Sequence, residues 1–331
     1  MRKFTLILLV FTMGVFVNAQ NVLNDIDFKT GRGAGNFGES KLKKVSKKIF
    51  INQFFINYQL VYMDSEQTSE GVYHGSTKSS ITVGFEGITE NDLQTNTDKI
   101  YSEYITKLKN DGFEIITADE AKDIKLLQDY KMVKGGELKR AQKLGYGTTA
   151  PTDHSYFIKS ITKKGKEKMS FLDKKSKISS QLGDVIVVNV VITIPFMADG
   201  ESTGSKLLTG AVGGISKNVA MPFLRISSDP RYTNTSYAWT DKTVVHMPLK
   251  DEIVIADVFE KEKFKAIAGA KANTSYDMGI HRIVVSEDVT TTNVQIAKCD
   301  IEKYKKGIYE ASSLFIDKST DNFLDLVNGK K

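Results

Sequence analysis

The stretch DVIVVNVVITIPF, residues 184–196, is the longest β-branched run in the chain and constrains the fold most strongly. β-branched side chains lose χ1 freedom in a helix, and Pro195 would break a helix but can close a strand. Because side chains alternate across a strand, one face of this run is wholly apolar and the other carries Asn189 and Thr193 among valines. The run therefore predicts a central strand with one face in the core and the other partly covered.

The beginning of the chain has the organisation of a secretory signal peptide. Two basic residues precede an apolar stretch from Phe4 to Val17, and Ala19 provides a small residue before Gln20. The apolar stretch is shorter than the roughly 20 residues that a membrane-spanning helix needs, so a retained anchor is the weaker alternative. We expect residues 1–19 to be removed and the mature chain to be exported, either remaining in the periplasm or being secreted.

The cysteine content and the net charge of the chain exclude some means of stabilisation and some partners. Cys299 is the only cysteine, which excludes an intrachain disulfide and a lipid-anchor cysteine after the signal. Removing Arg2 and Lys3 from the 46 basic residues leaves 44 against 40 acidic ones, an excess too small to indicate nucleic-acid binding. Stability must therefore come from packing, and we expect no nucleic-acid partner.

Basic residues concentrate between Lys134 and Lys177, and this segment predicts a positive surface that could meet anionic lipid, polysaccharide or an acidic protein. A solvated, lysine-rich surface without a partner is the alternative. The candidate binding residues are Lys163, Lys164, Lys166, Lys168, Lys174 and Lys175.

Strand and helix patterns alternate along the mature chain. After a Gly-rich and basic leader over residues 20–47, the apolar and aromatic segment 48–64 predicts a long strand bent near Gln53 or Asn57. Apolar stripes, and a capping box from Thr117 to Glu120, predict helices over 92–111, 300–316, 117–130 and 138–144. The tail over 321–327 is expected to add a helical turn. Further strands are expected over 81–88, 219–227, 243–246, 253–259, 282–285 and 293–297.

This order of elements predicts an α+β fold, a mixed central sheet with helices packed mainly on one face. Residues 48–331 are long enough for a single domain with a substantial core, or for two lobes divided near residues 135–155.

A serine hydrolase is one function that the motifs leave open. Gly200-Glu201-Ser202-Thr203-Gly204 has the spacing of a nucleophile elbow and follows the central strand, with Asp257 and His281 as candidate acid and base. The helix that should follow Ser202 would contain several glycines, which disfavour helix formation. A Gly- and Ser-rich loop is therefore the stronger interpretation, and no catalytic residue is assigned.

No cofactor or metal is predicted. The dinucleotide-like spacing Gly33-x-Gly35-x-x-Gly38 lies in the leader, without the preceding strand that such a site needs. The four histidines and Cys299 are dispersed, without the paired spacing of a zinc site.

The Gly-rich segment 199–217 lies between two apolar strands and supports a second alternative. It could refold into a membrane-crossing hairpin of an oligomer, since a spanning strand needs only about ten residues. A long surface loop is the simpler interpretation. The candidate membrane or assembly residues are Leu207, Leu208, Gly210, Gly213 and Gly214.

The layout resembles exported α/β envelope domains of the CsgG and TolB N-terminal type in Gram-negative bacteria. The features that carry it are the signal peptide, the early aromatic strand, the helix 92–111 closing on NDGFEIIT (110–117), and VVNVVITI (187–194). The signal ending Asn18-Ala19-Gln20 is similar to those of exported Bacteroidota proteins. The resemblance implies a non-catalytic assembly or binding role. We expect an exported protein that contacts other envelope components or forms a homo-oligomer.

Overall fold

The computed structural model describes residues 26–28, 45–67, 78–163, 167–169, 175–199, 219–228, 231–233, 245–268 and 294–330. Within these ranges the fold is α+β, as predicted, and is built on a nine-stranded mixed sheet. Its two central strands are β1 (Lys48–Gln59) and β11 (Ile186–Ile194), which run parallel to each other. Around them lie β4 (Glu114–Ile116), β6 (Lys139–Arg140), β7 (Tyr146–Thr149), β14 (Arg225–Ser228), β15 (Arg231–Thr233), β16 (Val245–His246) and β17 (Ile253–Val254).

Strand β11 has the alternation that its sequence predicts. The side chains of its apolar face are fully buried, whereas Asn189, Val191 and Thr193 on the other face are only half-buried. In β1 the alternation is interrupted once, because the register with β11 shifts between Ile51 and Gln53. The irregularity thus lies beside Gln53, one of the two positions at which a bend was predicted.

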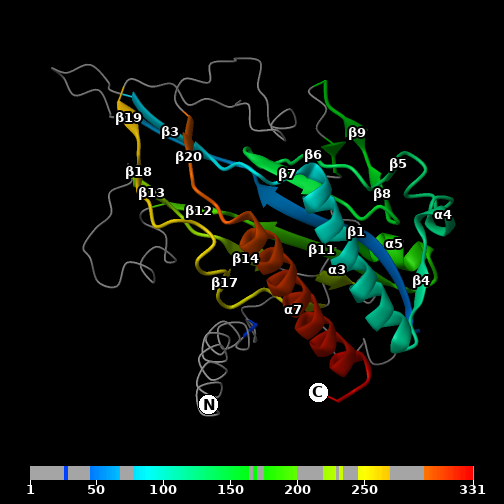
Figure 1. Ribbon diagram of the computed structural model, residues 1–331. Helices are drawn as coiled ribbons and strands as arrows, with labels where there is room; N and C mark the ends of the chain where they lie inside the picture. Colours follow the sequence, from blue (N-terminus) through cyan, green and yellow to red (C-terminus); the bar gives the residue numbers. More distant parts are fainter. Residues whose placement is uncertain are drawn as a thin grey trace, which may run out of the picture.

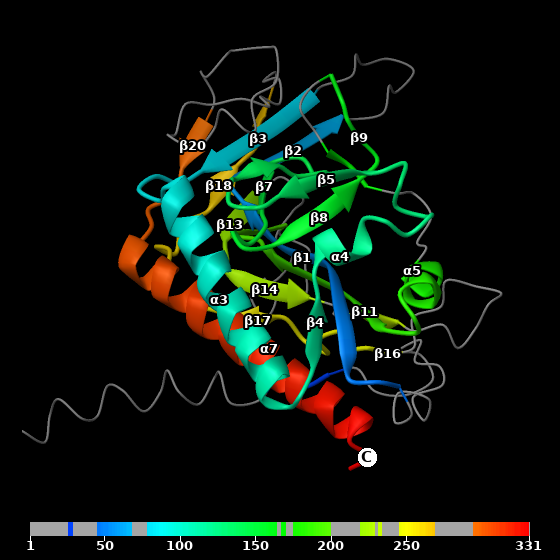
Figure 2. The same cartoon turned by 90° about the vertical axis from the view of Figure 1, so that its right-hand side faces the viewer.

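Helices α3 (Glu90–Asn110) and α7 (Ile301–Val327) lie side by side on the apolar face of β1 and β11 (Figures 1 and 2). Helix α3 begins at a capping box formed by Thr89 and Asp92, which confirms the predicted helix. Helix α7 runs without a break through residues 317–320, which joins the helix predicted over 300–316 to the turn predicted over 321–327. Its apolar stripe resumes at Phe323, and the intervening Thr320 faces the core with its hydroxyl bonded to the Ile316 carbonyl at 2.6 Å.

Among the described residues, two short helices cover part of the opposite face of the sheet. Helices α4 (Ala118–Ala121) and α5 (Lys175–Gln181) pack there against Phe50, Val185 and Val187, at the amino-terminal ends of β1 and β11 (Figure 2). The two long helices thus share one face of the sheet, and the two short ones lie on the other. We call the face under α4 and α5 the pocket face.

One predicted helix is too long and another is wrong. The capping box of Thr117 and Glu120 forms, but α4 ends after one turn, because Leu127 turns into the apolar cluster beneath it. The segment 138–144 is a strand and a turn, since Lys139 and Arg140 pair with β7. In both segments tertiary contacts override the local helical pattern.

Smaller sheets complete the described structure (Figure 1). Phe28, within the predicted leader, bridges to Leu249 and lies 6.0 Å from the Phe315 ring, measured between ring centroids. Among the described residues, no helix has the length and apolar character needed to span a membrane. The smaller sheets contain β2 (Val61–Gln67), β3 (Lys78–Gly84), β19 (Ile267–Ala268) and β20 (Val294–Ile296); β12 (Met197–Asp199), β13 (Val219–Pro222) and β18 (Phe264–Lys265); β5 (Lys131–Lys134) and β8 (Ser155–Ile158); and β9 (Ser160–Ile161) and β10 (Glu167–Lys168).

Candidate ligand-binding pocket

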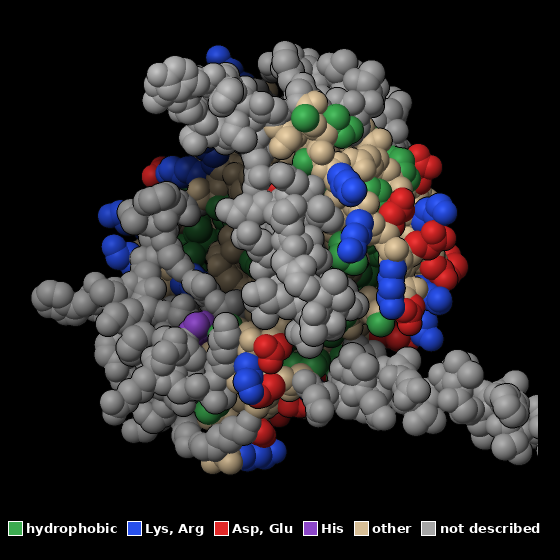
Figure 3. Space-filling model, turned by 90° about the vertical axis from the view of Figure 1, so that its left-hand side faces the viewer, with side chains coloured by type: hydrophobic (Ala, Val, Ile, Leu, Met, Phe, Trp, Pro, Cys, Tyr) green, Lys and Arg blue, Asp and Glu red, His purple; other side chains and the backbone are tan. Residues whose placement is uncertain are grey.

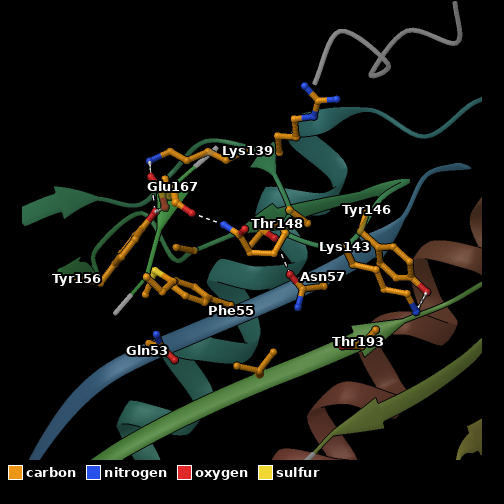
Figure 4. A pocket seen from close by; sticks show the side chains of 16 residues that line it. Gln53, Phe55, Asn57, Lys139, Lys143, Tyr146, Thr148, Tyr156, Glu167 and Thr193 are labelled. Carbon is orange, nitrogen blue, oxygen red and sulfur yellow. Dashed lines mark hydrogen bonds and ion pairs between the residues drawn. The ribbon is translucent and has the colours of Figure 1, made fainter. Parts of the chain in front are cut away.

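A pocket of about 420 Å³ lies on the pocket face, beyond the part that α4 and α5 cover. Its floor is formed by Gln53, Phe55 and Asn57 of β1 together with Val191 and Thr193 of β11 (Figure 4). Phe55, Asn57, Val191 and Thr193 lie in the carboxyl-terminal halves of these two parallel strands, and Gln53 lies at the middle of β1. The volume falls within the range of small-molecule sites.

The wall of the pocket opposite this floor is formed by a hydrogen-bonded cluster of Lys139 from β6, Tyr156 from β8 and Glu167 from β10. The Glu167 carboxylate accepts hydrogen bonds from Lys139 Nζ at 2.9 Å and from the Tyr156 hydroxyl at 2.8 Å (Figure 4). The Lys139 and Glu167 side chains are 23% and 15% exposed. Burial, reinforced by the Glu167 charge, raises the pKa of Tyr156 well above its usual range. Tyr156 therefore remains a neutral hydrogen-bond donor at all physiological pH values.

The floor carries two oriented amides. Asn189 Nδ2 donates to Gln53 Oε1 at 2.7 Å, and the Thr148 hydroxyl donates to Asn57 Oδ1 at 2.5 Å. Both amide oxygens are thereby engaged. The amide nitrogens of Gln53 and Asn57 have no hydrogen-bond partner in the described ranges, so they are available as donors to a molecule in the pocket.

Two further cations line the pocket near the turn between β6 and β7. Lys143 Nζ lies 3.2 Å from the Tyr146 hydroxyl and 4.5 Å from the centroid of that ring. Arg140 is half-buried and makes no ion pair within the described part of the chain. With Lys139 matched by Glu167, Arg140 and Lys143 leave the pocket with an excess of positive charge.

Aromatic side chains support the pocket from behind. The Phe55 and Tyr156 rings meet edge to face with centroids 4.9 Å apart, and the His154 ring stacks on Tyr156 at 6.1 Å. His154 is only 5% exposed, and its Nε2 has no hydrogen-bond partner among the described residues. Burial lowers the pKa of His154 from the ordinary 6.5 to about 4.

This buried histidine predicts a loss of stability in mild acid. Because the pKa is lower in the folded state, the unfolded chain binds the proton first, and stability falls as the pH drops from about 6.5 toward about 4. Between pH 7 and pH 5 we expect the free energy of unfolding, measured by urea titration, to fall by about 2 kcal/mol. The His154→Phe variant keeps an aromatic ring and should lose most of this dependence. Equal pH dependence in the two proteins would contradict the assignment.

The structure separates the lysines that were predicted as one basic surface. Lys163 and Lys168 are exposed, but Lys175 is wrong as a surface residue, because it is 3% exposed. It begins α5, which lies close on the sheet with the Ser179 hydroxyl donating to the Val185 carbonyl at 2.5 Å. Lys164, Lys166 and Lys174 lie outside the described residues. On another face of the molecule, basic and acidic side chains are interspersed along one edge (Figure 3).

The other candidate residues from the sequence are not brought together. Asp257 is exposed in a turn with φ +58°, and Ser202 and His281 lie outside the described residues. The same holds for the candidate assembly residues Leu207, Leu208, Gly210, Gly213 and Gly214. Within the described ranges, no group of three or more His, Cys, Asp or Glu side chains is placed to hold a metal ion.

Comparisons of this chain with protein-family models, with curated proteins and with solved structures give no match. The resemblance to CsgG- and TolB-type domains therefore stays a prediction, and the geometry of the pocket carries the functional argument. Sequence reasoning did not find this pocket. The available signal was the polar interruption of two apolar strands at Gln53, Asn57, Asn189 and Thr193.

Proposed function

We propose that this protein is an exported, non-catalytic binding protein of the bacterial cell envelope, and that the pocket on β1 and β11 holds its small-molecule ligand. The observation that carries the proposal is the division of the pocket face. Its amino-terminal half is apolar and covered by helices, whereas its carboxyl-terminal half presents amides and cations to a cavity. Polar groups in the middle of a sheet weaken packing unless they form hydrogen bonds, and a bound ligand can provide the partners for those bonds.

The chemistry of the pocket supports binding more than catalysis. Among the described residues, those that line the pocket include no serine, cysteine or histidine that could act as a nucleophile or general base, and their one carboxylate, Glu167, is occupied by Lys139 and Tyr156. Oriented amides and aromatic rings are the groups with which binding sites fix a ligand. Export is supported by the signal-like residues 1–19.

The proposal is tested by filling the pocket. Val191 is half-buried, lines the pocket and pairs with Phe55, so Val191→Phe should project a ring into the cavity. Ligand-observed NMR with the chain from Gln20 onward would screen organic acids, phosphate esters, monosaccharides and dipeptides. We expect at least one class to bind saturably, and Val191→Phe to weaken that binding by about tenfold or more.

The matched control is Val254→Phe, the same change at a half-buried strand position outside the pocket. It should leave the binding unchanged, and circular dichroism would show that both variants keep the fold. If no class of compound shows binding that Val191→Phe removes and Val254→Phe preserves, the pocket is not the binding site.

A further inference from the structure

The hydrogen bonds inside the pocket leave it with an excess of free donors. The side-chain oxygens of Gln53, Asn57 and Glu167 accept bonds from neighbouring residues. The amide nitrogens of Gln53 and Asn57 and the Arg140 guanidinium have no partner in the part of the chain that the structure describes. A ligand that satisfies these groups must bring acceptors rather than donors.

The charges of the lining residues also favour a ligand that carries acceptors. Within the part of the pocket lining that the structure describes, three cations, Lys139, Arg140 and Lys143, stand against one carboxylate, that of Glu167. Arginine and lysine groups favour carboxylate and phosphate oxygens, with which they form charge-assisted hydrogen bonds. Between these polar groups the lining is apolar, with Phe55, Met169 and Val191 among its residues.

We propose that the ligand is an organic anion, a carboxylate or phosphate group carried on a compact apolar body; this inference rests on the proposed function. The anionic oxygens would take bonds from the floor amides and the β6–β7 cations, while the apolar body lies against Phe55. A neutral polyol fits this site poorly, because it brings no charge to meet the cations and its hydroxyl donors would find the side-chain oxygens of Gln53, Asn57 and Glu167 already engaged.

Two sets of substitutions test the charge requirement in opposite directions. Replacing the two cations that form no ion pair with a described carboxylate, Arg140→Gln with Lys143→Gln, should weaken binding of the anion by about tenfold, and more at low salt than at high salt. Glu167→Gln keeps the size of the side chain and removes the opposing charge, so it should tighten binding by about threefold. A merely structural role of Glu167 would instead give weaker binding.

The matched control for the double substitution is Lys261→Gln with Lys263→Gln, which removes the same charge from two exposed residues outside the pocket. It should change the affinity less than twofold, which separates a local effect from a change in net charge. Thermal unfolding of every variant checks that the fold is kept.

The experiment is isothermal titration calorimetry of the chain from Gln20 onward with benzoate and phenyl phosphate, alongside benzyl alcohol, inorganic phosphate and glucose. We expect one or both aromatic anions to bind, with benzyl alcohol, phosphate alone and glucose at least tenfold weaker. The preferred anion tells a carboxylate from a phosphate-ester ligand. Binding of glucose or benzyl alcohol that Val191→Phe removes, but that the double substitution leaves unchanged, would overturn this inference and leave the proposed function standing. No binding sensitive to Val191→Phe in this set or in the wider screen would overturn both.

Discussion

Replacing Gly145 by alanine should destabilise the protein by about 3 kcal/mol, since it combines backbone strain with a steric clash. Gly145 has φ +78°, and a Cβ atom there would lie 2.1 Å from the carbonyl oxygen of Val61. The Gly145 carbonyl also accepts the backbone N–H groups of Leu60 and Val61, at 2.8 and 3.0 Å. The turn that carries Lys143 and Tyr146 into the pocket is therefore fixed against the end of β1, and urea unfolding would measure the loss.

Gly183→Ala is the matched control for this substitution. Gly183 also has a left-handed backbone, with φ +84°, but no atom lies within 4 Å of the position that a Cβ would occupy. Only the conformational strain remains, and we expect a loss of about 1 kcal/mol. Equal losses for the two variants would show that the contact between Gly145 and Val61 does not hold the turn.

Replacing Phe54 by alanine should cost about 4 kcal/mol, because a fully buried ring leaves a cavity that a packed core cannot close. Phe54 is 0% exposed and lies beneath α3, with its ring centroid 5.1 Å from that of Tyr101 and 5.6 Å from that of Tyr104. Thermal or urea unfolding measures the loss. Binding of a pocket ligand should change little, since this side chain lies on the helix-covered side of β1.

Phe55, the next residue in the strand, provides the comparison on the opposite face. It is half-buried, lines the pocket and meets Tyr156. Phe55→Ala should lose about 2 kcal/mol of stability but weaken ligand binding by about tenfold. The reverse result, with binding lost in Phe54→Ala and kept in Phe55→Ala, would contradict the division of β1 into a core face and a pocket face.

The central strand and the two long helices were predictable because each has a periodic pattern that its tertiary contacts reinforce. The run 184–196 has a period of two on a face that is entirely core, and α3 has both a capping box and an apolar stripe. Helix α7 was predicted as two pieces, 300–316 and 321–327, because Ser319 and Thr320 between them are polar in sequence but buried against the core in the fold. Hydroxyl groups that bond within their own helix can enter a core that sequence reasoning assigns to apolar residues.

The pocket was not predictable in the same way, because it joins residues that are far apart in the chain. Asn57 and Thr193 become neighbours only through the parallel pairing of β1 with β11. Glu167 reaches Lys139 from a separate hairpin, which no periodicity indicates.

The basic segment was predicted as a surface from its composition, yet Lys175 is buried and Lys139 is neutralised by Glu167. Composition gives the charges present but not the partners that each charge meets.

A crystal structure of the chain with bound phenyl phosphate would test the central claim most directly, which is that the polar half of the pocket face is an anion-binding site. The account predicts the phosphate oxygens within hydrogen-bond distance of the Gln53 or Asn57 amide nitrogens and of Arg140 or Lys143, with the phenyl ring against Phe55. A phosphate found only at other lysines on the surface, with the pocket holding solvent, would contradict it.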